Sequence, residues 1–240
     1  MDLRVLTLAL ETSLTSGSVA IIDEARTLQE IILPPETRSA QSLAPAIERV
    51  LRETGTAARD IALIATTAGP GSFTGLRVGV MTAKTLAFAW KCAVIGVDTL
   101  EVLARQAVAE TSSARMHAVM DGQRRQLFAA TFQVSTTGEW NAEGPAAVVD
   151  RAVWLAELRP GDLVTGPGLA PLLPALPPGV IAAEEEVRAP RASMVGRVGL
   201  EHLLRGRRDD WRTLAPRYLR PSAAEEKRAA RDAGVDLSSG

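Results

Sequence analysis

A glycine-rich stretch in the first half of the chain constrains its fold more than any other feature. It reads Ala68-Gly-Pro-Gly-Ser-Phe-Thr-Gly-Leu-Arg-Val-Gly-Val80 and follows an aliphatic, β-branched run at 61–66 that predicts a buried strand. Residues 76–90 lack proline and are rich in helix formers, so they predict a helix. The intervening glycines allow a tight turn, and Ser72 or Thr74 could cap the helix. The stretch therefore predicts a strand, a turn and a helix N-terminus in direct succession.

Such a turn is a candidate anion site because free N–H groups and the helix dipole converge at a helix N-terminus. The candidate residues in this loop are Gly69, Gly71, Ser72 and Thr74. Two phosphate-binding templates fail here: the P-loop needs Lys and Ser/Thr where Leu76 and Arg77 stand, and the dinucleotide fingerprint needs a glycine at Thr74. We therefore favour a structural turn and keep phosphate binding as the alternative.

Small residues recur along one face of the predicted helix. Gly75, Gly79, Ala83 and Ala87 are spaced four apart, which places them in one stripe. A mid-helix glycine costs about 1 kcal/mol relative to alanine, so Gly79 should have a packing role. The stripe lets another helix approach closely, either within this chain or in a partner, and the pattern leaves both alternatives open.

Composition limits the class of protein. The chain has 240 residues, 46% of them hydrophobic, which suits one large domain or two lobes. A net charge of −1 gives the whole molecule no pull on nucleic acid or membranes. A single cysteine excludes an intramolecular disulfide and a cysteine metal cluster. With neither a signal-peptide pattern nor an apolar run of about 20 residues, we expect a soluble cytoplasmic protein without a membrane span.

The order of predicted elements repeats. In the first half we expect strands at 3–10, 18–22, 27–33, 61–66 and 93–97 and helices at 39–53, 75–90 and 99–109. In the second half we expect strands at 116–120, 126–133, 146–149 and 162–165 and helices at 151–158 and 192–205. Three antiparallel strands followed by alternating helix and strand thus occur twice, which predicts two similar α/β lobes.

Five segments, in order over residues 3–221, resemble the TsaB (YeaZ) family of tRNA threonylcarbamoyladenosine biosynthesis. They are Leu8-Ala-Leu-Glu-Thr-Ser13, Gly69-Pro-Gly-Ser-Phe-Thr-Gly-Leu-Arg-Val-Gly79, Val94-Ile-Gly-Val-Asp-Thr-Leu100, Met120-Asp-Gly-Gln-Arg-Arg-Gln-Leu-Phe128 and Pro216-Arg-Tyr-Leu-Arg-Pro221. The glycine-rich segment is specific, whereas the other four are persuasive together.

The resemblance implies an α/β fold of two tandem actin/hexokinase/Hsp70-like (ASKHA, ribonuclease H-like) lobes, each a mixed sheet flanked by helices. We place the N-terminal lobe at 1–104 and the C-terminal lobe at 105–220, with the helix at 192–205 able to pack back on the first lobe. Residues 221–240 are rich in Ala, Glu, Lys and Arg without an apolar face, so we expect a flexible tail.

The resemblance further implies a non-catalytic scaffold subunit that pairs with TsaD, alongside TsaE, for threonylcarbamoyl transfer to adenosine 37 of tRNA. The resemblance implies that this pairing uses the two helices at 39–53 and 75–91. In isolation we expect a homodimer through the same two helices. The candidate contact residues are Leu43, Ile47, Val50, Gly75, Val78, Gly79, Thr82 and Ala83. The alternative is an independent ATP-dependent small-molecule kinase or hydrolase of the same fold.

Few residues suggest chemistry of the chain's own. His117 and His202 are too far apart for a His-x-x-x-His metal pair, and we expect both to be structural. Glu11, followed by Thr12, ends the first strand where the ATP-using members of the fold carry an aspartate, so both join the candidate nucleotide loop. Asp98 and Asp121 end two further strands, and we favour solvated acids over a paired-carboxylate metal site. We expect no metal and no cofactor in the isolated chain, and ATP or ADP with Mg²⁺ only at the junction of a complex.

Arginines gather near the end of the chain. Residues 188–220 hold nine arginines against three acidic residues. The candidate contacts to tRNA phosphates are Arg205, Arg207, Arg208, Arg212 and Arg217. Solvated arginines and ion pairs within the chain are the alternative that we favour.

Overall fold

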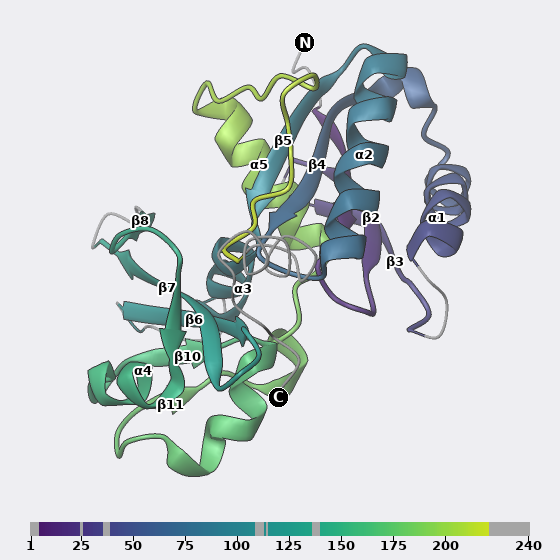
Figure 1. Cartoon of the computed structure of the whole chain (residues 1–240). Helices are drawn as coiled ribbons and strands as arrows, with labels where there is room; N and C mark the ends of the chain where they lie inside the picture. Colours follow the sequence, from purple (N-terminus) through teal and green to yellow (C-terminus); the bar gives the residue numbers. More distant parts are fainter. Residues whose placement is uncertain are drawn as a thin grey trace, which may run out of the picture.

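The first of two sheets has the strand order β3-β2-β1-β4-β5 in the computed structural model, which describes residues 5–24, 26–35, 39–108, 113, 115–135 and 140–220 (Figure 1). The expected tail at 221–240 lies outside these residues. The elements of this half are β1 (Leu6–Glu11), β2 (Ser18–Asp23), β3 (Arg26–Ile32), α1 (Ser39–Thr54), η1 (Ala58–Asp60), β4 (Ile61–Gly69), α2 (Phe73–Trp90), β5 (Ala93–Asp98) and α3 (Thr99–Val108). β1, β4 and β5 are parallel, whereas β2 and β3 run antiparallel.

Both faces of the first sheet are covered, which explains why its central strands are apolar along their whole length. Leu8 and Leu10 of β1 face α1 and α2, where they join Leu43 and Ala83 in one buried cluster. Ala9, between them, points to the opposite face and packs with residues of α5 (Ala192–Leu204). The alternation of side chains along the strand therefore builds two cores from one sheet.

The second sheet repeats the order of the first. Its elements are β6 (Arg115–Asp121), β7 (Gln126–Val134), β8 (Trp140–Ala142), β9 (Ala147–Asp150), α4 (Arg151–Glu157), β10 (Leu163–Thr165), η2 (Pro167–Ala175), β11 (Ile181–Ala182) and η3 (Glu185–Val187). The strand order is β11-β10-β6-β7-β8, with β9 also paired to β7. β6 thus occupies the place of β1, and β10 that of β4.

The last helix of each lobe packs against the sheet of the other lobe. α3 follows the last strand of the first sheet, but Leu100 and Leu103 pack with Met116 and Phe132 of the second sheet. α5 follows the second sheet and packs on the first, where Gly199 lies so close that an added methyl group would stand 2.6 Å from Ala65. The exchange ties the two lobes together.

Residues 205–220, which we term the strap, return along β5 toward the second lobe (Figure 1). The Arg217 N–H donates to the Ala68 carbonyl at 2.6 Å, and Lys84 Nζ donates to the Leu214 carbonyl at 2.8 Å. Farther along, Arg220 Nη1 donates to the Gly122 carbonyl of the second lobe at 2.5 Å. The strap therefore contacts both lobes.

The predicted fold class is confirmed: two sheets, each flanked by helices, follow one order of elements. Every strand and helix expected from the sequence lies within a few residues of its predicted place, whereas the short β8 and β11 were not predicted. Of the helices described, none is both long enough and apolar enough to span a membrane.

Candidate functional site

A cleft of about 910 Å³ opens between the two lobes. Its walls are the turns that follow β1 and β6, the loops that follow β4 and β10, and the strap. The lining residues fall in five places, 13–15, 70–73 with Arg77, 120–124 with Phe128, Pro167 and 217–220. The cleft therefore collects the ends of equivalent strands from both lobes, and the glycine-rich stretch forms one of its walls.

The glycine-rich loop packs against the turn after β1. Ser72 caps α2, as expected, by accepting from the Gly75 N–H at 3.3 Å, and its own N–H donates to the Ser13 carbonyl at 2.7 Å. A methyl group at Gly71 would lie 2.6 Å from Ser13 Cβ, and one at Gly75 would lie 2.1 Å from the Thr12 carbonyl oxygen. These glycines let two backbone segments touch, so the structural turn describes the loop.

The small-residue stripe of α2 faces inward. A methyl group at Gly79 would lie 2.1 Å from Thr12 Oγ1, and Ala83 is fully buried against the first sheet. Within the chain, the stripe thus makes room for the end of β1.

The structure corrects which side chains of α1 and α2 can meet a partner. Six of the eight candidate contact residues are buried in this chain's own core, namely Leu43, Ile47, Val50, Gly75, Gly79 and Ala83. Only Val78 and Thr82 are half-buried. These are the apolar positions of amphipathic helices, and such positions face the helix's own sheet. The large exposed apolar side chains of α2 are Met81 and Phe88, each 62% exposed.

Glu11 lies inside the protein and not in the cleft. Its side chain is fully buried, and its Oε1 accepts hydrogen bonds from the Ser13 N–H at 2.6 Å and the Ser13 hydroxyl at 2.5 Å. Burial raises the pKa of Glu11 to about 7, although the hydrogen bonds from Ser13 oppose that shift. Its Oε2 is buried with no hydrogen-bond partner. The expectation that the strand-end acids are solvated is therefore wrong for Glu11. This side chain is buried and anchors the turn that forms the cleft wall.

The three strand-end acids do not meet. Asp121 lines the large cleft and pairs with Arg151 Nη2 at 2.9 Å. Asp98 lines a separate cavity of about 370 Å³, with residues of the strap between the two spaces. Its Oδ1 caps α3, and its Oδ2 lies 3.7 Å from Arg217. Burial raises the pKa of Asp98, and Arg217 opposes that shift. Together with the buried Glu11, these positions make no paired-carboxylate site.

Both histidines are held by neighbouring side chains, as expected. His117 is buried, with Nε2 3.1 Å from Asp162 Oδ2 and Nδ1 3.0 Å from Thr131 Oγ1. His202 Nε2 lies 3.1 Å from Glu101 Oε2. In the part of the chain that the structure describes, no three His, Cys, Asp or Glu side chains are grouped so as to hold a metal ion.

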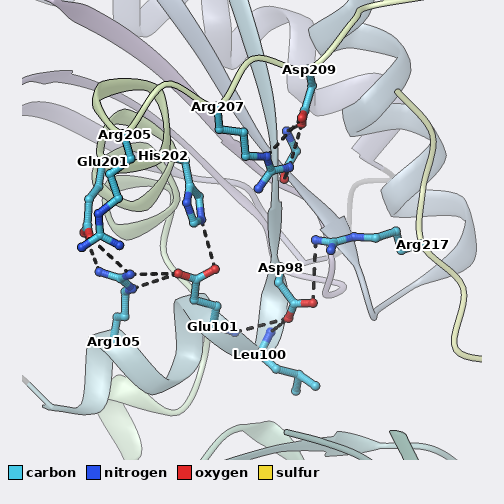
Figure 2. Close-up of polar contacts among 11 residues, drawn as sticks. Asp98, Leu100, Glu101, Arg105, Glu201, His202, Arg205, Arg207, Asp209 and Arg217 are labelled. Atoms are coloured by element: carbon cyan, nitrogen blue, oxygen red, sulfur yellow. Dashed lines mark hydrogen bonds and ion pairs between the residues drawn. The ribbon is translucent and has the colours of Figure 1, made fainter. Parts of the chain in front are cut away.

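Most arginines of the candidate tRNA patch are paired with carboxylates (Figure 2). Arg207 Nη2 lies 2.8 Å from Asp209 and also donates to the Gly96 carbonyl, which fixes the strap to the edge of β5. Arg205 lies 2.6 Å from Glu201, and Arg212 lies 3.7 Å from Asp210. Arg217 faces Asp98, while Arg208 is exposed. Four of the five candidate arginines therefore form ion pairs within the chain, which is the alternative to tRNA contact that the sequence favoured.

An aromatic cluster at the cleft wall went unrecognised in the sequence. The Phe73 and Tyr218 rings stack with centroids 4.6 Å apart. The Arg77 guanidinium lies 3.9 Å from the Phe73 centroid, and Arg77 Nε donates to the Tyr218 hydroxyl at 3.1 Å. Tyr218 is far in sequence from Phe73 and Arg77, and it meets them only because the strap crosses the loop. A second missed signal, Gly166-Pro-Gly168, repeats Gly69-Pro-Gly71 at the equivalent place in the second lobe.

The residues of the loop do not fit a nucleotide phosphate. The Ser72 and Gly75 N–H groups, two of those that an anion at this helix N-terminus would use, already donate within the chain. The turn after β1 fills the space beside Gly71 and Gly75. We therefore derive no chemistry through a nucleotide held by this loop.

Comparisons with known proteins place these observations in a family. The model of the family described as "TsaD: tRNA N6-adenosine threonylcarbamoyltransferase" matches residues 28–155. The chain is 32% identical over 142 residues to a "tRNA threonylcarbamoyladenosine biosynthesis protein TsaB" of Escherichia coli, covering 59% of this chain and 61% of that protein. The protein of the same name from Bacillus subtilis is 30% identical over 155 residues, 65% of this chain and 66% of that protein. The chain thus matches less than two thirds of the length of each.

Solved structures match over more of the chain. YeaZ from Pseudomonas aeruginosa covers 90% of this chain with a TM-score of 0.77 and 26% identity, and all of that protein is matched. A second structure, described as an uncharacterized protein with similarity to peptidase YEAZ from Pseudomonas aeruginosa, gives the same coverage and TM-score at 28% identity. The resemblance seen in the five sequence segments is confirmed.

Proposed function

Because this chain belongs to the TsaB (YeaZ) family, we propose that it is a non-catalytic scaffold subunit in the formation of threonylcarbamoyladenosine at position 37 of tRNA. It pairs with TsaD, which carries out the transfer, and acts alongside TsaE. The observation that carries this proposal is the match to TsaB proteins and YeaZ structures along most of the chain.

The geometry of the glycine-rich loop supports a scaffold over a catalyst. In this chain the loop and the first strand-end acid hold two backbone segments together: Ser72 is bonded to Ser13, and Ser13 to Glu11. Glu11 is fully buried in this arrangement, so this acid is not available to a substrate. ATP or ADP with Mg²⁺ would then be held at the junction with the partner and not by this chain alone.

The exposed face of α2 is the surface that we assign to pairing, with TsaD or, in isolation, with a second copy of this chain. Met81 and Phe88 lie seven residues apart and therefore on one side of the helix, and both are 62% exposed. Phe88 also contacts Trp211 of the strap, with ring centroids 4.8 Å apart. An apolar helix face of this kind suits burial against another helix.

A reconstituted tRNA modification assay tests the proposal. TsaC, TsaD and TsaE are supplied with tRNA, and this chain is added as wild type, as Met81→Glu or as Val153→Glu. Val153 is 55% exposed on α4 of the second lobe and serves as the matched control. We expect transfer to require the chain, to fall about tenfold or more with Met81→Glu because a charge is buried at the contact, and to persist with Val153→Glu.

Transfer that proceeds equally without the chain contradicts the scaffold role. Turnover of ATP by the isolated chain would then favour a kinase or hydrolase. Transfer that needs the chain but tolerates Met81→Glu moves the pairing surface away from α2.

A further inference from the structure

We infer that the cleft between the lobes binds a single-stranded segment of RNA, whose phosphates meet Arg77 and Arg124 and one of whose bases lies against Tyr218. This inference rests on the proposed function, which makes tRNA the substrate. It places the RNA on a surface that shares only Arg217 with the arginine-rich patch of the sequence.

The charge of the cleft is the first support. Four arginines line it (Arg77, Arg124, Arg217 and Arg220), whereas Asp121 is its single acidic lining residue among those described. Asp121 is itself paired with Arg151 at 2.9 Å. A concave surface lined by one sign of charge concentrates the opposite charge, so the cleft favours a polyanion although the whole chain has a net charge of −1.

Arg77 differs from the arginines of the strap in the partners that hold it. Its guanidinium lies over the Phe73 ring and its Nε donates to the Tyr218 hydroxyl, and both partners are neutral. Arg205, Arg207 and Arg212 instead lie within 4 Å of carboxylates. Among the residues that the structure describes, Arg77 therefore has no carboxylate partner, and its charge is already oriented, which suits a phosphate.

Tyr218 supplies the aromatic surface. Its ring is stacked on Phe73 at 4.6 Å and is 37% exposed where it lines the cleft. Proteins that bind single-stranded RNA combine a positive groove with aromatic rings on which unstacked bases lie. A duplex cannot use such a ring because its bases are stacked on one another.

The turn after β6 has an unusual backbone where it lines the cleft. Gln123, Arg124 and Arg125 follow one another with φ of +63°, +48° and +62°, although none is glycine. Left-handed residues in succession are strained, and such strain gathers at binding sites. Arg220 of the strap donates to the Gly122 carbonyl and so fixes this turn. The conformation places Gln123 and Arg124 on the cleft wall.

The same geometry favours RNA over a free nucleoside triphosphate. The N–H groups of Ser72 and Gly75 are already used, and Gly71 is packed on Ser13, so fewer backbone donors remain for a triphosphate at the glycine-rich loop. Guanidinium groups along a cleft suit the evenly spaced phosphates of a strand.

Fluorescence anisotropy with the full chain tests the inference. The probes are a labelled hairpin RNA of about 17 nucleotides with an unpaired loop and a blunt RNA duplex of equal length, at about 50 and 200 mM salt. The variants are Arg77→Gln, Tyr218→Leu and Tyr218→Phe, and circular dichroism checks that each is folded. Arg59→Gln is the matched control, since Arg59 is an exposed arginine that precedes β4 whereas the cleft lies beyond its other end.

We expect the hairpin to bind more tightly than the duplex, with an affinity that falls as salt rises. Arg77→Gln and Tyr218→Leu should each weaken hairpin binding about fivefold or more, whereas Tyr218→Phe keeps the ring and should stay within about twofold of wild type. Arg59→Gln should not change the dissociation constant.

Several results would overturn the inference. Equal binding by wild type, Arg77→Gln and Tyr218→Leu removes the cleft from RNA recognition, as does duplex binding as tight as hairpin binding. A further variant, Arg208→Gln, probes the arginine-rich patch, and loss of binding in that variant alone returns the site to the patch. Displacement of the hairpin by free ATP makes a mononucleotide the occupant. If tRNA modification requires the chain but Arg77→Gln leaves RNA binding intact, this inference fails and the scaffold role stands. If RNA binds in the cleft but tRNA modification proceeds without the chain, the scaffold role fails and this inference stands.

Discussion

The turn after β1 and the turn after β6 occupy equivalent places in the two lobes, yet they meet the cleft in opposite ways. β1 ends in Glu11, which is buried and holds Ser13 from inside. β6 ends in Asp121, whose side chain is 60% exposed and pairs with Arg151 on the surface. The first lobe thus uses its strand-end acid to hold a cleft wall from inside, and the second leaves its acid on the cleft surface.

The loops after β4 and β10 show the same contrast. Both begin Gly-Pro-Gly, and the first glycine has a positive φ in each, +124° at Gly69 and +110° at Gly166. Gly69 is followed by the 18-residue α2, whereas Gly166 is followed by the 9-residue η2. One plan therefore yields a long helix with an exposed apolar face in the first lobe and a short segment in the second. The surface that we propose for pairing lies on this long helix of the first lobe.

The largest expected effect tests whether the two loops are equivalent. Alanine at Gly69 would place Cβ 2.2 Å from the Arg217 carbonyl oxygen, and alanine at Gly166 would place it 2.1 Å from that of Val119. Backbone strain and overpacking together should lower the free energy of unfolding by about 4 kcal/mol in each variant. Urea denaturation measures both.

Gly144→Ala is the control for this pair. Gly144 has a φ of +107° but nothing within 4 Å of an added methyl group, so only strain of about 1–2 kcal/mol is expected. A loss in Gly69→Ala no larger than in Gly144→Ala would mean that the strap lifts away from the loop, and the loops would then not be equivalent.

Much of the fold was predictable because it depends on local patterns. The apolar run at 61–66 and the glycine turn after it predict β4, the loop and α2, and Ser72 caps the helix as its side chain allows. The repeated order of elements predicted the second sheet. The two-residue β11 was missed because so short a strand has no periodicity of its own.

The site was less predictable because it depends on contacts between distant residues. Glu11 is buried because α5, far downstream in the sequence, covers the first sheet. The Ala192 N–H donates to Ser18 Oγ across 174 residues, and Ser18 pairs with Glu11 across β1 and β2. Tyr218 reaches Phe73 only through the path of the strap. No spacing along the sequence records either contact, whereas the second Gly-Pro-Gly could have been found by aligning the two halves.

A pH series on Glu11 sharpens the contrast between the strand-end acids. Burial raises the pKa of Glu11 from an ordinary 4.5 to about 7 in the folded chain. Between these values the folded state keeps a proton that the unfolded state has lost, so stability falls as the pH rises from 4.5 and levels off above 7. The shift corresponds to about 3 kcal/mol.

Glu11→Gln should remove this decline when urea denaturation is compared at pH 5 and pH 8. Asp121→Asn, at the equivalent exposed position, should change the free energy of unfolding by less than about 0.5 kcal/mol. An undiminished decline in Glu11→Gln would show that other groups cause it and that the two strand ends do not differ in this way.

The smallest effect belongs to His117 in the second lobe and has the opposite sign. Burial, with Arg115 nearby, lowers the pKa of His117, and Asp162 only partly opposes this. As the pH falls below the ordinary value of 6.5, the unfolded chain binds a proton that the folded chain does not bind, so stability is lost toward acid.

His117→Gln should lower the free energy of unfolding by about 1–2 kcal/mol at pH 8 through its lost hydrogen bonds. In the Glu11→Gln background, which lacks the opposing slope, His117→Gln should flatten the acid limb between pH 6.5 and 5. If the acid limb stays unchanged, His117 does not titrate on unfolding, and the buried pair with Asp162 is then a hydrogen bond without linkage to pH.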